Sequence, residues 1–152
     1  MTAVYDLDET DKAIIRELQV DGRLPHAKLA PMVGLSQTAT RQRVNRLIER
    51  GVIQVVAVTD PVALGVGYQA WIGVTVSGDA RVVAEALAEI EEADYVVVVA
   101  GRFDVMAEIV CTGSDEFMSV VNDRIRSIPG VVGLETLYYL RLVKQSYNWG
   151  TG

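Results

Sequence analysis

Over the first third of the chain, short apolar stretches at helical spacing alternate with polar or glycine breaks. A first helix is predicted after the acidic start at residues 8–11, because carboxylates favour a helix N-terminus, and it ends at Gly22. Pro25 suits the first turn of a second helix, which ends at Gly34, and Ser36 is a good N-cap for a third. The pattern therefore predicts three consecutive helices with short connections.

The third predicted helix carries an apolar stripe and is followed by a β-branched run. The stripe has i, i+4, i+7, i+8 spacing and consists of Thr40, Val44, Leu47 and Ile48. Gly51 ends the helix, and residues 52–58 predict a short strand or wing. We therefore expect a winged helix-turn-helix domain at residues 1–60, followed by a linker at 61–67.

The remainder of the chain, residues 68–152, alternates strand and helix patterns. Strands are predicted at 70–76, 95–100, 105–111 and within 131–143, and helices at 80–91 and from Ser114 onward. The run at 95–100 is apolar throughout, so we expect both of its faces to be covered. The order βαββαβ predicts a ferredoxin-like α/β sandwich with its helices on one sheet face, and hence an α+β protein.

Charge is distributed unevenly between the two halves, although the formal net charge is −6. Residues 1–64 contain eight Lys/Arg and eight Asp/Glu, whereas residues 65–152 contain six and twelve. Residues 36–50 contain four arginines and one glutamate. Binding of a polyanion depends on where positive charge lies more than on its total. A nucleic-acid partner is therefore compatible with the first half, and the acidic half is not expected to touch it.

The connection between the second and third predicted helices has the residues that a helix-turn-helix requires. Ala30 is small enough for a close crossing of the two helices, and Gly34 can adopt the positive φ of the turn. Val33 and Leu35 flank that glycine and can bury against both helices. This geometry, together with the local positive charge, predicts a protein that binds double-stranded DNA.

A polar face of the third predicted helix is suited to reading bases. With about 100° per residue and the apolar stripe inward, Thr38, Gln42, Asn45 and Arg46 point outward and Arg41 borders them. Glutamine, asparagine and arginine can make bidentate hydrogen bonds to base edges. An ordinary solvated helix face is the alternative, and the turn favours DNA binding over it.

Basic residues beside that face are better suited to phosphates than to bases. Arg43 and Arg50 lie on its opposite flank, and Lys28 is on the second helix. The predicted DNA-binding residues are together Lys28, Ser36, Gln37, Thr38, Arg41, Gln42, Arg43, Asn45, Arg46 and Arg50.

Several separate motifs together resemble the Lrp/AsnC, or feast/famine, family of transcriptional regulators. In the first half these are 7–11 with Gly22-Arg23, Leu29-Ala30, Val33-Gly34-Leu35-Ser36, Arg43-Val44 with Leu47, and Gly51-Val52-Ile53. In the second half they are residues 99–104, 128–131 and 143–145, whose order and spacing resemble the effector domain of that family. The resemblance covers nearly the whole chain.

The resemblance implies a regulator of amino-acid metabolism genes whose second domain binds a free amino acid or related metabolite. It implies a homodimer, often assembled further into an octamer, with the effector bound between dimers. The effector-binding residues that it implies are Gly101, Arg102, Phe103, Asp104, Thr136, Leu137 and Tyr138. From the residues themselves, Gly101 can admit a ligand carboxylate to the backbone and Asp104 can pair with an ammonium. A tight β-hairpin in which these two residues only make the turn is the alternative, and the ligand's charge preference stays open at Arg102.

Two other function classes remain as alternatives. Sirohaem decarboxylase subunits are similar in fold and bind a tetrapyrrole through histidines of the second domain, but His26 is the only histidine here. An architectural DNA-binding protein of the same family would bind long DNA with little sequence preference. We expect no enzyme, no catalytic residue, no cofactor and no metal, since Cys111 stands alone and the acids at 89–94 suit solvent better than a metal. With no signal peptide and no apolar run near the roughly 18 residues of a membrane span, we expect a cytoplasmic protein.

Overall fold

The computed structural model describes residues 5–59 and 63–146, and they divide into two compact units at Val58/Thr59 and again at Val143/Lys144. The predicted linker at 61–67 lies partly outside these residues. Within the described part of the chain, no helix has the length and apolar character that crossing a membrane requires.

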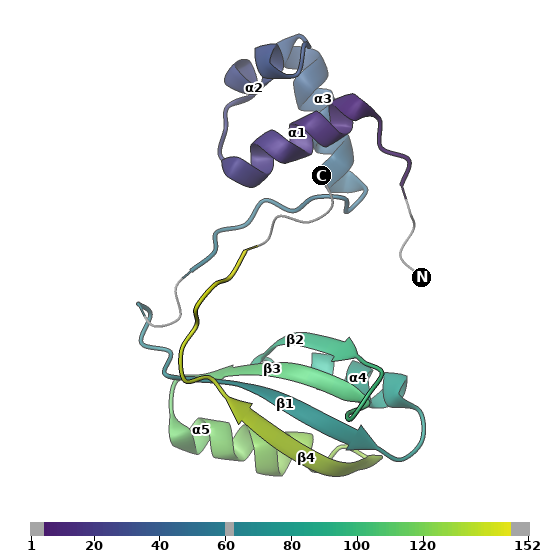
Figure 1. Cartoon of the computed structure of the whole chain (residues 1–152), viewed down its shortest axis with the longest axis vertical. Helices are drawn as coiled ribbons and strands as arrows, with labels where there is room; N and C mark the ends of the chain where they lie inside the picture. The colour runs from purple at the N-terminus through teal and green to yellow at the C-terminus, as the bar shows by residue number, and fades with distance from the viewer. Residues whose placement is uncertain (1–4, 60–62, 147–152) are drawn as a thin grey trace. The chain divides into compact units, whose positions relative to one another are not determined.

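The first unit contains three helices, as the pattern predicts: α1 (Glu9–Val20), α2 (His26–Met32) and α3 (Gln37–Glu49) (Figure 1). Their core consists of Ile14, Ile15, Leu29, Val44 and Leu47. Ile48 was expected inward but is 43% exposed. It lies about 100° around the helix from Leu47, at the edge of the buried face.

The predicted wing strand is absent. The backbone N–H of Val52 donates to the carbonyl of Leu47 at 2.9 Å, which closes the end of α3, and no strand follows over 52–58. A β-branched run becomes a strand only when another strand pairs with it. Every strand in the described residues belongs to the second unit, so this segment is extended but unpaired.

The second unit follows the predicted order βαββαβ. Its elements are β1 (Tyr68–Val76), α4 (Ala80–Ala88), β2 (Ala93–Val98), β3 (Val105–Cys111), α5 (Ser114–Ser119), the π-helix η1 (Val120–Ile125) and β4 (Val131–Tyr138). The sheet order is β2-β3-β1-β4 and all neighbours are antiparallel. This is the ferredoxin-like arrangement expected from the sequence, an α+β fold.

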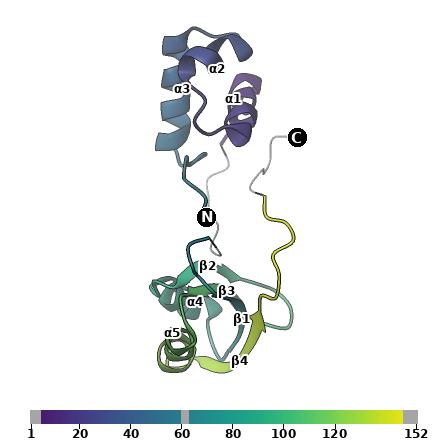
Figure 2. The same ribbon diagram turned by 90° about the vertical axis from the view of Figure 1, so that its left-hand side faces the viewer.

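One face of the sheet is covered by helices and the other is not. Ala70, Ile72 and Val74 of β1 are fully buried against α4 and the α5–η1 segment, which lie on the same side of the sheet (Figure 1; Figure 2). Trp71 and Gly73 alternate with them and belong to the opposite, helix-free face. We call this surface, which carries no helix, the helix-free face of the sheet.

The expectation that residues 95–100 are covered on both faces is wrong. Tyr95 and Val98 of β2 are 54% and 48% exposed. Tyr95 is exposed because the register places it on the same face as Trp71, which has no helix over it. Val98 belongs to the helix-covered face but is the last residue of β2, which is an edge strand of the sheet. A continuous apolar run in this chain therefore marks a half-covered strand.

Candidate nucleic-acid interface

The turn between α2 and α3 has the predicted geometry. Gly34 has φ +69°, a backbone conformation that residues other than glycine rarely adopt. The backbone N–H of Leu35 donates to the carbonyl of Ala30 at 2.9 Å, and Ala30 is only 4% exposed. The small side chain and the left-handed glycine together hold the two helices of a helix-turn-helix close to each other.

The start of α3 is fixed by Ser36, as the sequence predicts. Its Oγ accepts a hydrogen bond from the backbone N–H of Ala39 at 3.2 Å, and its carbonyl accepts one from the Thr40 hydroxyl at 2.9 Å. Thr40 is fully buried, so its hydroxyl is satisfied inside the helix. The polar face of α3 therefore begins at a defined residue.

Most of the predicted DNA-binding residues lie on the surface. Gln37, Thr38, Arg41, Gln42 and Asn45 of α3 are exposed. Ser36 and Arg50, at the two ends of α3, and Lys28 of α2 are exposed as well. Glutamine, asparagine and arginine on one helix face provide donors and acceptors for base edges in a major groove.

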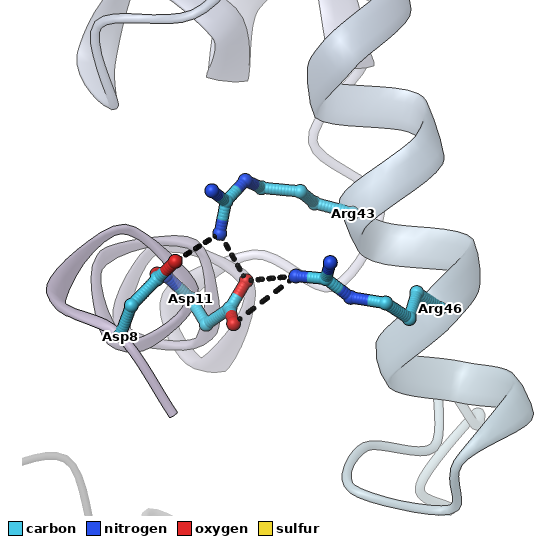
Figure 3. Close-up of polar contacts among 4 residues, drawn as sticks. All are labelled: Asp8, Asp11, Arg43 and Arg46. Atoms are coloured by element: carbon cyan, nitrogen blue, oxygen red, sulfur yellow. Dashed lines mark hydrogen bonds and ion pairs between the residues drawn. The ribbon is translucent and has the colours of Figure 1, made fainter. Parts of the chain in front are cut away.

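Arg43 and Arg46 are only partly exposed, and both turn toward the N-terminus of α1 (Figure 3). The Arg43 guanidinium donates to Asp8 Oδ2 at 2.6 Å and to Asp11 Oδ1 at 2.8 Å. The Arg46 guanidinium donates to both carboxylate oxygens of Asp11, at 3.1 and 3.2 Å. We call these four residues the Asp–Arg cluster. The sequence pattern did not reveal it, although the acids at 8–11 were already visible as a helix start.

The electrostatics of this cluster favour the charged forms of its members. The Arg43 guanidinium, together with the backbone N–H of Asp11, holds the pKa of Asp8 below its ordinary value of 3.8. The carboxylates of Asp8 and Asp11 in turn raise the pKa of Arg43. Two carboxylates therefore compensate two of the four arginines of residues 36–50.

The loop at Gly101–Asp104 connects β2 to β3, and its last residue is hydrogen-bonded to β1. Gly101 has φ +148°, and the Asp104 carboxylate accepts a hydrogen bond from the backbone N–H of Val76 at 2.8 Å. The Asp104 N–H donates to the carbonyl of Val74 at 3.0 Å. These two contacts fix Asp104 against β1.

The structure brings only part of the expected effector set together. Arg102 forms an ion pair with Glu135 of β4, and its guanidinium lies 5.4 Å from the centre of the Phe103 ring. Leu137 is on the same face of β4 as Glu135 by the register of that strand with β1. Glu135 was not singled out from the sequence, because strand alternation alone does not tell which loop faces it.

Thr136 and Tyr138 belong to the opposite, helix-covered face of β4. The Tyr138 ring contacts Tyr68 and Phe117 edge-on, with centroids 5.9 and 6.5 Å away. Its hydroxyl donates to the carbonyl of Gly67 at 2.7 Å. Within one chain, Gly101–Asp104 and Tyr138 therefore do not line a common site.

The helix-free face of the sheet carries an aromatic group. Trp71 meets Tyr95 edge-on with centroids 5.6 Å apart, and the Phe103 ring lies directly over Gly73. The Tyr139 hydroxyl donates to Glu108 at 2.8 Å, and burial together with this carboxylate raises the pKa of Tyr139. An exposed sheet face with this composition is typical of a protein interface.

The remaining polar residues have structural surroundings. Cys111 is 2% exposed, and burial, with the Glu116 carboxylate nearby, raises the pKa of its thiol to about 11. Glu92, from the acids at 89–94, pairs with Arg124. In residues 5–59 and 63–146 there is no group of three or more His, Cys, Asp or Glu side chains placed to hold a metal ion.

Both units match described domain families. Residues 7–48 match the AsnC-type helix-turn-helix domain, and residues 71–152 match a C-terminal dimeric alpha+beta barrel domain. These matches cover the three helices and the βαββαβ unit respectively.

The whole chain is similar to named regulators. It is 37% identical to an HTH-type transcriptional regulator of Pyrococcus horikoshii, over 92% of this chain and 93% of that protein. It is 32% identical to the leucine-responsive regulatory protein of Salmonella typhimurium, over 93% of this chain and 89% of that one. Among solved structures, a transcriptional regulator of Neisseria meningitidis in complex with L-methionine superposes with a TM-score of 0.82 and 28% identity, covering 95% and 97% of the two chains.

Proposed function

Because this chain belongs to the Lrp/AsnC family of transcriptional regulators, we propose that it recognises particular DNA sequences through α3 and that an amino acid or related metabolite controls this binding. The DNA-binding part of this proposal is supported by the exposed polar face of α3, the helix that follows the turn at Gly34. Thr38, Gln42 and Asn45 supply hydrogen-bonding groups there. Arg41 and Arg50 have no ion pair among the described residues and are available to phosphates or guanines.

A selection experiment tests this recognition directly. The full chain is incubated with a pool of random duplexes, and bound duplexes are recovered and sequenced. We expect a partly palindromic preferred sequence, with half-sites about 34–36 Å apart when a dimer presents two copies of α3 to successive major grooves. Equal affinity for every duplex would contradict sequence-specific regulation and would favour an architectural DNA-binding protein.

Base readout can be separated from phosphate binding with single variants. Gln42→Ala should reduce the ratio of specific to random-duplex affinity by about tenfold, because a bidentate contact discriminates between bases. Arg50→Gln should weaken both affinities equally, because a phosphate contact carries no sequence information. An unchanged ratio in Gln42→Ala would remove this residue from the reading face.

We place the dimer contact on the helix-free face of the sheet. That face carries Trp71, Phe103 and the exposed Tyr95, and a second copy would remove these rings from water. The matching domain family is described as dimeric, which supports this assignment. Assembly of dimers into a larger particle such as an octamer is part of the same proposal.

The effector is proposed to be an amino acid, with Gly101–Asp104 as its first contact. The L-methionine complex of the Neisseria meningitidis regulator supports this ligand class. Asp104 would pair with the ammonium group and Arg102 with the carboxylate. Since Thr136 and Tyr138 lie on the other sheet face of the same chain, their contribution to a shared site would come from a neighbouring copy.

A thermal-shift screen against a panel of amino acids tests the effector site. Asp104→Asn is a suitable variant, because the amide oxygen can still accept the Val76 N–H while the negative charge is lost. We expect the stabilising amino acid to lose its effect in Asp104→Asn and to keep it in Asp115→Asn, an acid of α5. Equal shifts in both variants would move the ammonium site away from Asp104.

A further inference from the structure

The Asp–Arg cluster joins the start of α1 to the middle of α3 through directed contacts. Asp8 uses its two carboxylate oxygens for different purposes: Oδ1 accepts the N–H of Asp11 at 2.7 Å and caps α1, and Oδ2 accepts from Arg43. Asp11 accepts from both arginines at once. The two helices are thus connected by four hydrogen bonds between oppositely charged groups, in addition to their apolar packing.

Burial decides which partner the arginines keep. The Asp11 side chain is 7% exposed, whereas those of Arg43 and Arg46 are 27% and 42% exposed. A carboxylate that is removed from water and then loses its cations is left strongly destabilised. Moving both arginines to DNA phosphates would leave Asp11 in that state, so the cluster retains them.

Directionality gives the cluster a role that the apolar core cannot have. Contacts of Ile14, Val44 and Leu47 are non-directional, so they bring α1 and α3 together without strongly fixing the rotation of α3 about its axis. Charge-assisted hydrogen bonds to guanidinium groups fix both distance and angle. Side chains on the outward face of α3 are oriented by this same rotation.

We propose that Asp11, assisted by Asp8, is a positioning residue for DNA recognition: it holds Arg43 and Arg46 against α1 and thereby sets the rotation at which α3 meets DNA. Reading is left to Thr38, Arg41, Gln42 and Asn45. The inference rests on the proposed DNA-binding function, and it removes Arg43 and Arg46 from the residues predicted to touch DNA.

The dependence of DNA affinity on salt separates an arginine that binds phosphate from one that binds Asp11. Affinity for a random duplex is measured over a series of salt concentrations for the wild-type chain, Arg46→Gln and Arg50→Gln. Each phosphate contact contributes about 0.9 to the slope of log affinity against log salt. We expect Arg50→Gln, the proposed phosphate contact, to lose about that amount and Arg46→Gln to keep the wild-type slope. A slope reduced equally in Arg46→Gln would overturn the proposal.

A double-mutant cycle tests whether Arg46 acts through Asp11. The measured quantity is the ratio of affinities for the selected duplex and a random duplex, in Asp11→Asn, Arg46→Gln and the double variant. We expect each single change to lower this ratio by about tenfold and the double variant to lower it no further. Additive losses would make Arg46 an independent contact. A rise in affinity for all duplexes in Asp11→Asn would mean that Asp11 only competes with DNA for the arginines.

Two further measurements keep the outcome decisive. Asp11→Glu retains the carboxylate and should recover part of the ratio lost in Asp11→Asn, which loss of helix packing alone would not explain. If Asp11→Asn does not fold, Arg43→Gln and Arg46→Gln still decide through the salt slope, because their side chains are partly exposed. If the wild-type chain selects no sequence, the proposed function fails, while the slopes on random duplex still test the cluster.

Discussion

At the scale of single residues, Gly73 leaves the space on β1 that the Phe103 ring fills. A Cβ at position 73 would lie 2.6 Å from three atoms of that ring, well inside contact distance. Phe103 belongs to the loop that carries Asp104 and Arg102. The absence of one side chain on a strand therefore positions a loop that is distant in sequence.

Gly73→Ala should destabilise the second unit by about 1–3 kcal/mol, since overpacking forces ring or backbone to move. Gly133→Ala is the matched control, because its Cβ would meet Thr75 at an ordinary 3.4 Å on the same sheet face. Urea unfolding of both variants measures the difference. Equal stability of the two would mean that the Phe103 ring can swing aside at no cost.

Asp8 makes the stability of the first unit depend on pH in a definite direction. Its pKa is lower in the folded chain than its ordinary value of 3.8, so near that pH the unfolded chain binds more protons. The ion pair therefore contributes stability well above pH 3.8 and loses it as the pH falls through the folded pKa. In Asp8→Asn, which keeps an N-cap, the stability deficit should shrink on acidification. Urea midpoints at a series of pH values measure this, and a constant deficit would contradict the role of the ion pair.

At the residue scale, the sequence predicts which side chains of α3 are exposed, but it does not predict the partners of Arg43 and Arg46. Thr38, Gln42 and Asn45 follow from helical periodicity, which fixes the direction of each side chain. Arg43 and Arg46 have the same residue type as Arg41, and periodicity does not tell which arginine a distant carboxylate will hold. Their partners lie more than 30 positions away in the sequence.

At the scale of elements, helix starts were predicted better than strands. Ser36 is the N-cap of α3, as expected, and α5 begins at Ser114, also as expected. The N-cap of α5 is Gly113, which has no side chain, and the Glu116 carboxylate accepts from the N–H of Thr112 at 2.7 Å. A cap is a local interaction of three or four residues, so the sequence contains most of its determinants. Strand pairing and exposure depend on distant segments, and for that reason the wing at 52–58 and the covering of β2 were wrong.

The difference between the two serines gives a stability test. Ser36→Ala should cost about 1 kcal/mol, because the N–H of Ala39 loses its acceptor. Ser114→Ala, one residue inside α5, should change stability by less than about 0.5 kcal/mol. Thermal unfolding of both variants compares them. A larger loss in Ser114→Ala would mean that the Ser114 hydroxyl stabilises the start of α5.

At the scale of the whole molecule, the sequence predicts the order of the elements but not the surface through which two copies would associate. The order βαββαβ and the three-helix unit can be predicted from the sequence, because each depends on hydrophobic periodicity within short segments. The sequence does not predict which face of the sheet a second copy would cover, since both faces of a central strand carry apolar residues. Trp71 could be assigned to core or to interface only once β1 had been placed against its helices.

A charge placed on the helix-free face should weaken self-association. Tyr95→Glu introduces a carboxylate beside Trp71, where burial by a second copy would strongly disfavour it. Val82→Glu is the control, because Val82 is similarly exposed, at 61%, on α4. Sedimentation at a series of protein concentrations should show dissociation of Tyr95→Glu alone. Dissociation of Val82→Glu instead would place the contact on the helix side.

The two hydrogen bonds of the Asp8 carboxylate have a consequence for how the sequence can change over time. One oxygen begins α1 and the other pairs with Arg43, so a single substitution at position 8 affects a helix cap and an interhelical ion pair together. Asparagine or serine at this position would preserve the helix cap but lose the ion pair with Arg43. Relatives that have drifted at position 8 should therefore have changed position 43 as well, and the two positions should vary as a pair across the family.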